Sequence, residues 1–230
     1  MNTLILLAGG VGSRMNQGGC PKQYMELHGE PLISYSLKTF EDHEETDKII
    51  IVAAEEWREF IDSVIKKYSI SKFCGYADPG ETRQFSIING LELLRDGAGT
   101  DDIVIIHDAA RPLVSQELIS SCFSGIKGYD GVLPVLPVKD TFYYSDDKRS
   151  VSSLLEREKL FAGQAPESFK LMEYIKANDS LTREELLKIN GSTEVAVKYG
   201  MNIRMIPGEE RNFKVTTPDD LELFEMYRDK

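Results

Sequence analysis

The stretch LILLAGGVGSRMNQGGCPKQY, residues 4–24, joins an apolar run to a glycine-rich turn that is followed by cations. The apolar run predicts a strand, and the glycines let the backbone of the turn approach a ligand and aim consecutive N–H groups at an anion. Arg14 and Lys22 can oppose the charge that grows on a triphosphate when it is attacked. The stretch therefore predicts an α/β fold with a nucleotide-binding loop after its first strand.

Spacing excludes two other phosphate-binding loops. A P-loop requires Gly-Lys followed by Ser or Thr, and that tripeptide is absent from the sequence. In the dinucleotide fingerprint a third glycine would follow Gly10 and Gly12 at position 15, which is Met15. A plain glycine-rich turn remains the alternative interpretation of the glycines alone.

Strand-like and helix-like patterns alternate along the rest of the chain. The runs IIIVAA and DIVIIHD are apolar at successive positions, which is typical of central strands buried on both faces. This alternation predicts an α/β fold whose mostly parallel sheet carries helices on both faces. The predicted strands are 3–8, 48–54, 102–107 and 131–136, and the predicted helices are 32–41, 55–68, 82–96 and 115–127.

Residues 138–162 break this alternation. Polar and apolar residues alternate there around the polar turn at residues 145–149, which predicts a long β-hairpin. Such an arm, with its aromatic residues 142–144, would be poorly stable alone, so we expect it to pair with a second subunit in a homodimer. The alternative is a hairpin folded back on its own domain.

Composition limits the classes of function. A chain of 230 residues without evident repeats or linkers predicts a single domain over 1–230. The net charge of −11 makes nucleic acid an unsuitable partner. The three scattered cysteines favour a reducing compartment, and no apolar run approaches membrane-spanning length. We therefore expect a cytoplasmic protein with no membrane partner.

Polar residues gather where predicted strands end and helices begin. Arg83 and Ser86 follow the turn at Gly80, so a guanidinium, a hydroxyl and backbone N–H groups meet at one helix start. Asp108 ends an apolar strand and is placed to hold Mg²⁺. The alternative is a purely structural role as a helix N-cap. Lys214 lies just before a capped helix start.

The ordered set of AGG-x-GSRM, PKQ, G-x-x-R-x-x-S, HDAARP, KDT and N-x-K-x-T-x-x-DL resembles the polyol-phosphate cytidylyltransferases over essentially the whole chain. This family includes enzymes for 2-C-methyl-D-erythritol 4-phosphate and for ribitol 5-phosphate. The resemblance implies a Rossmann-like nucleotidyltransferase fold, with residues 138–162 as a dimerisation arm. It also implies CTP and a polyol phosphate as substrates, with Mg²⁺ as cofactor.

The same resemblance implies roles for individual residues. Arg14, Lys22 and Lys214 would be the catalytic cations around the triphosphate, and Asp108 would hold Mg²⁺. CTP would be bound by Ala8, Gly9, Gly10, Gly12, Gly80, Arg83 and Ser86. The polyol phosphate would be bordered by Asp108, Arg111, Lys139, Asp140 and Arg157, the last reaching the site of the neighbouring subunit. Arg111 and Arg157 could instead be ordinary surface residues.

Two segments depart from the family pattern. The usual Q-T-P-Q is Q-A-P-E at residues 164–167, and the usual T-D-x-A-S is N-G-S-T-E at residues 190–194. Two hydroxyl donors are lost unless Ser192 or Thr193 replaces one. Because both changes lie on the polyol side, they favour a pentitol 5-phosphate such as ribitol 5-phosphate over methylerythritol phosphate.

The expected reaction is the attack of an alditol phosphate on CTP, which gives a CDP-alditol and pyrophosphate. Positioning and charge neutralisation would carry the catalysis, without a general base. A non-catalytic nucleotide-binding regulatory protein is the alternative from another class. A uridylyl- or guanylyltransferase of similar architecture is the lesser enzymatic alternative.

Overall fold

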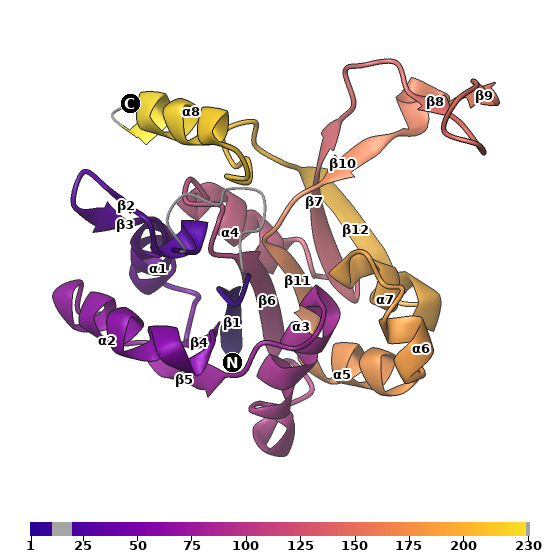
Figure 1. The fold of residues 1–230 in the computed structure, drawn as a ribbon. Helices are drawn as coiled ribbons and strands as arrows, with labels where there is room; N and C mark the ends of the chain where they lie inside the picture. Colours follow the sequence, from indigo (N-terminus) through magenta and orange to yellow (C-terminus); the bar gives the residue numbers. More distant parts are fainter. Residues whose placement is uncertain (11–19, 229–230) are drawn as a thin grey trace.

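A twisted sheet of eight strands forms the centre of the protein in the computed structural model, which describes residues 1–10 and 20–228 (Figure 1). Along the sheet the order is β10-β7-β11-β6-β1-β4-β5, and β12 pairs with β7. The strands are β1 (Asn2–Leu7), β4 (Lys48–Val52), β5 (Phe73–Ala77), β6 (Ile103–Asp108), β7 (Gly131–Pro137), β10 (Phe161–Gly163), β11 (Glu167–Lys170) and β12 (Ile203–Pro207).

The predicted mostly parallel sheet is confirmed. Strand β1 lies between β4 and β6 in parallel register, with Leu4 opposite Ile49 on one side and Ile105 on the other. Strands β10 and β11 run antiparallel to β7, and β11 also runs antiparallel to β6. The chain leaves the sheet at the end of β7 and comes back as β10, which pairs with β7 in the opposite direction.

The predicted elements match the observed ones within a few residues at their ends. Helices α1 (Leu32–Asp42), α2 (Arg58–Lys67), α3 (Arg83–Glu92) and α4 (Gln116–Ser124) correspond to the four predicted helices, and α8 (Pro218–Arg228) begins after Lys214 as expected. The sequence interpretation did not include β5, β11 or β12, and it covered β10 only as the returning side of the hairpin at 138–162. It also did not include α5 (Leu171–Asp179), α6 (Arg183–Leu186) and α7 (Ser192–Tyr199).

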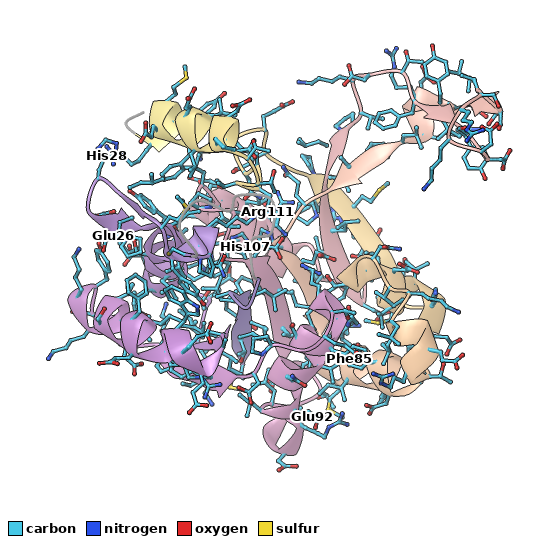
Figure 2. All side chains as sticks on the ribbon, viewed as in Figure 1. Glu26, His28, Phe85, Glu92, His107 and Arg111 are labelled. Atoms are coloured by element: carbon cyan, nitrogen blue, oxygen red, sulfur yellow. The ribbon has the colours of Figure 1, made fainter. Side chains whose placement is uncertain are left out.

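The segment 138–162 projects from the body as a hairpin and carries its side chains away from the sheet (Figure 2). Its base continues the sheet through β7 and β10, and its tip holds one short ladder of β8 (Tyr143–Tyr144) with β9 (Ser153–Leu154). The predicted hairpin is thus present, but its paired segments are short. Tyr143 is 63% exposed and Leu154 62% exposed.

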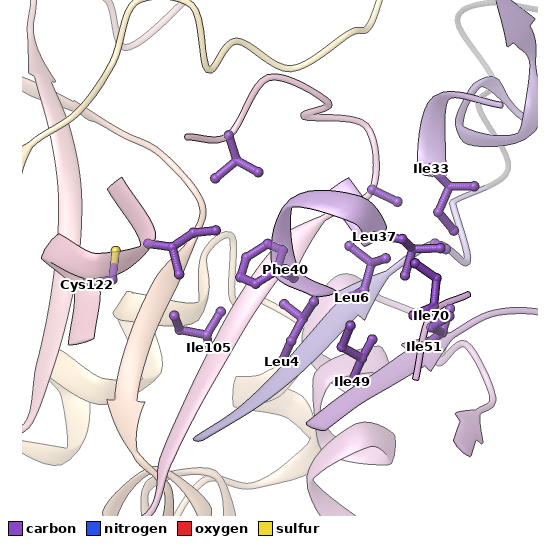
Figure 3. Close-up of a cluster of buried hydrophobic side chains, with 14 of the residues drawn as sticks. Leu4, Leu6, Ile33, Leu37, Phe40, Ile49, Ile51, Ile70, Ile105 and Cys122 are labelled. Carbon is purple, nitrogen blue, oxygen red and sulfur yellow. The ribbon is translucent and has the colours of Figure 1, made fainter. Parts of the chain in front are cut away.

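Side chains from alternate strand positions fill two apolar layers, one on each face of the sheet. Leu4 and Leu6 face α1, α2 and α4. The close-up of this layer shows them with Leu37 and Phe40 of α1 and Cys122 of α4 (Figure 3). Ile5 faces the opposite way and packs in the second layer with α3, α5 and α7. Burial on both faces explains why the central strands are continuous apolar runs.

The described helices include none that is long and apolar enough to cross a lipid bilayer.

Candidate active site

A cavity of about 830 Å³ opens where β1, β4 and β6 end. Leu7, Ala54 and Asp108 mark those strand ends. The glycine loop after β1, the Gly80 turn and Asp108 thus meet at one crevice beyond the carboxyl ends of parallel strands. The cavity is lined by Leu7, Gly9, Gly10, Lys22, Gln23, Ala54, Pro79, Gly80, Glu81, Thr82, Arg83, Ser86, Asp108, Ala110, Lys214 and Thr216.

Two glycine turns meet at the wall of this cavity. A Cβ atom on Gly9 would lie 2.6 Å from the Cγ of Pro79, and one on Gly80 would lie 2.8 Å from the amide nitrogen of Ser86. Both positions therefore require glycine for the turns to pack together. The amide of Gly80 donates to Ser86 Oγ at 3.0 Å, so the serine holds this turn against α3.

Lys22 reaches the cavity because its neighbours fasten the end of β1. Gln23 Nε2 donates to the carbonyl oxygens of Ala8 and Gly10 at 2.5 and 2.8 Å, and Tyr24 Oη donates to that of Ala8 at 2.9 Å. Ala8 is buried and supports the loop without lining the cavity. Gly12 and Arg14 lie outside the described residues.

Asp108 lies at the centre of a group of cations. Its Oδ1 accepts from Arg83 Nε at 3.2 Å and its Oδ2 from Lys214 Nζ at 3.0 Å, while Arg111 Nε lies 3.7 Å from Oδ2. Burial alone would raise the pKa of Asp108, but the charges of Arg83, Lys214 and Arg111 outweigh it and hold this pKa well below its usual range. The group is therefore an ionised carboxylate among cations that can also face phosphates.

Lys214 comes to Asp108 from 106 residues away in the sequence. The amide of Val215 donates to the carbonyl of Ala110 at 2.8 Å, and the buried Val215 side chain packs with Leu32 and Phe224. These contacts fix the loop before α8 against the loop after β6. They explain why a motif near the end of the chain contributes to a site that begins at its first strand.

Arg111 supports the site from behind the cavity wall. Its Nη1 donates to the carbonyl of Asn212 at 2.7 Å, and the fully buried Asn212 donates to the carbonyl of Ala165 at 2.7 Å. The neighbouring His107 is also fully buried, and burial lowers its pKa to about 4. Figure 2 shows His107 and Arg111 together near the centre of the molecule.

Three predicted substrate residues lie on the projecting arm and do not line the cavity of their own chain. Lys139 Nζ lies 2.5 Å from a carboxylate oxygen of Glu210, and Arg157 Nη1 donates to the carbonyl of Lys139 at 3.3 Å. Asp140 is exposed beside them. Their suggested contact with substrate stays a prediction that depends on a second subunit.

The cavity lining holds two carboxylates, Asp108 and Glu81, and Glu81 is paired with Arg183 at 2.7 Å, so Asp108 is the residue that fits Mg²⁺. Within residues 1–10 and 20–228, no group of three or more His, Cys, Asp or Glu side chains could hold a metal ion. Mg²⁺ in such sites takes one or two carboxylates and completes its shell with phosphates and water. Asp108 is ionised, faces the cavity and has lone-pair directions beyond those used by Arg83 and Lys214.

The positions that depart from the family pattern do not offer free hydroxyl donors. Ala165 is buried, and the exposed Asn190 donates from its side chain to the carbonyl of Lys188 at 3.2 Å. Ser192 and Thr193 both donate their hydroxyl protons to Glu167, at 2.6 Å each. Neither hydroxyl is therefore available as a donor to replace a missing threonine.

Sequence reasoning missed Glu167 as a partner of Arg83 and Gln23 as a support of the glycine loop. The signal for Gln23 was its place beside Lys22 in the PKQ motif. For Glu167 the sequence offers only an acidic residue at 167 and hydroxyl residues at 192 and 193. These residues come into contact because α7 packs against β11, which the sequence does not show.

Known proteins are similar to this chain along its length. The sequence model of the family described as "IspD: 2-C-methyl-D-erythritol 4-phosphate cytidylyltransferase" matches residues 2–230. A ribitol-5-phosphate cytidylyltransferase of Streptococcus agalactiae is 31% identical over 230 residues, covering 100% of this chain and 96% of the relative. A 2-C-methyl-D-erythritol 4-phosphate cytidylyltransferase of Rubrobacter xylanophilus is 37% identical over 222 residues, covering 96% and 92%.

The fold is similar to a solved structure over nearly the same length. The crystal structure of the Francisella tularensis 2-C-methyl-D-erythritol 4-phosphate cytidylyltransferase superposes with a TM-score of 0.82 at 27% identity, covering 98% of each chain.

Proposed function

Since the chain belongs to the IspD family of cytidylyltransferases, we propose that it transfers CMP from CTP to a pentitol 5-phosphate such as ribitol 5-phosphate. The products are a CDP-alditol and pyrophosphate. The observation that carries the proposal is the cavity in which two glycine turns face Lys22, Arg83 and Lys214 around the ionised Asp108. Such a site suits a triphosphate and a second phosphate better than a neutral ligand.

The two substrates occupy different sides of the cavity in this proposal. CTP takes the side of the glycine turns at the ends of β1 and β5, where the packed backbones of Gly9 and Gly80 leave no side chain between them. The acceptor takes the side of β6, next to Asp108. Lys22 stands on the nucleotide side, while Arg83 and Lys214, which both contact Asp108, lie between the two sides.

The chemical step is a phosphoryl substitution that needs no general base. An oxygen of the acceptor phosphate forms a bond to the α-phosphorus of CTP, the bond from this phosphorus to the α–β bridging oxygen breaks, and pyrophosphate leaves. Lys22 and Lys214, with Arg14 as a further candidate, oppose the charge that accumulates in the transition state. When bound, Mg²⁺ supplies additional charge neutralisation at the phosphates, and Asp108 would hold it.

The choice of acceptor rests on the segments at 164–167 and 190–194. Ala165 offers no hydroxyl, Asn190 points its amide at the chain itself, and the hydroxyls of Ser192 and Thr193 donate to Glu167. A site without these donors discriminates against a substrate that requires them. The similar ribitol-5-phosphate enzyme of Streptococcus agalactiae supports the same choice.

We also propose that the protein acts as a homodimer in the cytoplasm. The arm exposes Tyr143, Leu154 and Val151, the last by 66%. An apolar face of this kind is stabilised when a second subunit covers it. The dimer would bring Arg157 of one arm to the cavity of the other chain.

One screen tests the reaction and its acceptor. Pyrophosphate release is measured with CTP, Mg²⁺ and either ribitol 5-phosphate, 2-C-methyl-D-erythritol 4-phosphate or related alditol phosphates. We expect the highest kcat/KM with a pentitol 5-phosphate. A higher value with methylerythritol phosphate would assign the protein to isoprenoid synthesis, and no turnover with any acceptor would favour the non-catalytic alternative.

A further inference from the structure

A buried carboxylate next to the cavity has no part in the reaction described so far. Glu167, at the start of β11, is 7% exposed. Its Oε1 accepts from Ser192 Oγ at 2.6 Å, and its Oε2 accepts from the Thr193 amide at 3.0 Å and the Thr193 hydroxyl at 2.6 Å. A buried carboxylate with this many partners holds several elements in fixed relative positions.

The carboxylate first fixes the start of α7. This helix has Gly191 at its N-cap, where no side chain caps the free amides. Glu167 fills that role from another element, because it accepts from the amide of Thr193 and places a negative charge at the positive end of the helix. Strand β11 and helix α7 are thereby joined at the edge of the acceptor side.

Glu167 also fixes Arg83. The Nη2 of Arg83 lies 3.5 Å from Glu167 Oε1, and its Nη1 donates to Ser192 Oγ at 2.8 Å. The third donor, Nε, reaches Asp108 Oδ1 at 3.2 Å. Burial disfavours the charge of Arg83, but Asp108 and Glu167 outweigh it and raise its pKa above the ordinary value. The guanidinium therefore spans two carboxylates, one on the cavity and one behind it.

This arrangement has a consequence for Asp108. Arg83 holds Oδ1, whereas Oδ2 is held by Lys214, the cation that opposes phosphate charge in the proposed reaction. While Glu167 holds Arg83 in place, Arg83 keeps Asp108 in its orientation. Oδ2 of Asp108 can then exchange Lys214 for another partner. Without Glu167, Arg83 loses its second counter-charge and can turn into the cavity, where it competes with Lys214 for the acceptor phosphate.

We propose that Glu167 is a positioning residue that, through Arg83, holds Asp108 and Lys214 in the geometry that binds the acceptor phosphate. This inference rests on the proposed function for the division of the cavity into a nucleotide and an acceptor side. It assigns to Glu167 an effect on the acceptor, because Arg83 ties Glu167 to Asp108 at the end of β6. It assigns little effect on CTP, because Glu167, Ser192 and Thr193 do not line the cavity beside the glycine turns.

The test compares Glu167→Gln with wild type in steady-state kinetics, with the acceptor that wild type turns over fastest. Failure of the pentitol assignment therefore leaves this test intact. We expect KM for the acceptor to rise by about 10-fold or more and KM for CTP to change by less than about twofold. In an Arg83→Gln background the same change should have no further effect, since the two residues act as a unit.

Glu185→Gln is the matched control. Glu185 caps helix α6 by accepting from the amide and hydroxyl of Thr182, at 2.8 Å each, so it is a capping glutamate at an exposed helix start. Its replacement should leave both KM values unchanged. Ser192→Ala is the second variant should Glu167→Gln fold poorly, because it removes the hydroxyl that bridges Glu167 and Arg83. It should also raise KM for the acceptor.

A purely structural role gives a different result. Lower thermal stability with unchanged KM for the acceptor in both variants would overturn the proposal. Equal increases in the two KM values, or effects of Glu167→Gln and Arg83→Gln that simply add, would overturn it as well.

Discussion

At the scale of single residues, the charge around Asp108 decides what the cavity can bind. Three cations approach one buried carboxylate, so the group stays ionised and the excess positive charge is available to phosphates. A body with a net charge of −11 thus contains a local site for highly anionic substrates.

Lys22→Ala and Lys214→Ala should each lower kcat by about 100-fold or more, the size of effect seen when a charge contact to a transition state is lost. The fold should persist, because Lys214 is 38% exposed and Lys22 is half-buried. Lys176→Ala, on the exposed surface of α5, is the matched control and should keep full activity. Near-normal turnover of either cavity variant would remove that lysine from the mechanism.

His107 should make the protein less stable in mild acid. Burial lowers its pKa to about 4 from an ordinary 6.5, so the native state stays neutral where the unfolded chain takes up a proton. Stability therefore falls as the pH is lowered from about 6.5 to about 4, by up to about 3 kcal/mol. Urea titrations across this range should show a smaller loss for His107→Gln, whereas His28→Gln, at an exposed histidine, should behave like wild type.

At the scale of elements, the arm at residues 138–162 projects from the body of the protein and exposes its large apolar side chains. Its tip is held by one ladder, in which Tyr143 pairs with Leu154 and Tyr144 with Ser153. An isolated hairpin of this kind is marginal in water. The arm is therefore expected to acquire its order and its apolar cover from a partner subunit.

Deletion of residues 142–152 should convert the proposed homodimer into monomers with little activity, since in that dimer the arm would carry the subunit contacts and bring Arg157 to the neighbouring site. Light scattering would give the molar mass and pyrophosphate release the activity. A monomeric wild type, or an active deletion variant of unchanged mass, would contradict this prediction.

At the scale of the whole molecule, the crevice joins segments from the two ends of the chain. Turns after β1 and β5, the end of β6 and the loop before α8 all contribute to it. A ligand that contacts all of these segments stabilises the folded state as a unit.

CTP with Mg²⁺ should therefore raise Tm more than UTP or GTP at the same concentration. At 100 times its Kd, a ligand adds about 2.7 kcal/mol to stability, which corresponds to a shift of roughly 5–11 °C for a protein of this size. Calorimetric scans with each nucleotide, with and without a chelator, would check this. Equal shifts for all three nucleotides would contradict the assignment of CTP.

The sequence by itself determined the alternation of strands and helices, the central apolar strands and the turns that need glycine, because these depend on local periodicity and local backbone conformation. Patterns around Lys22, Arg83, Asp108 and Lys214 also identified residues that line the cavity. Only the tertiary structure placed β11 between β6 and β7, because a strand as short as ESFK takes its direction from the neighbours that satisfy its hydrogen bonds. It alone brought Glu167 to Arg83 and α7, since a contact between distant segments depends on how helices pack on the sheet, which no local pattern encodes.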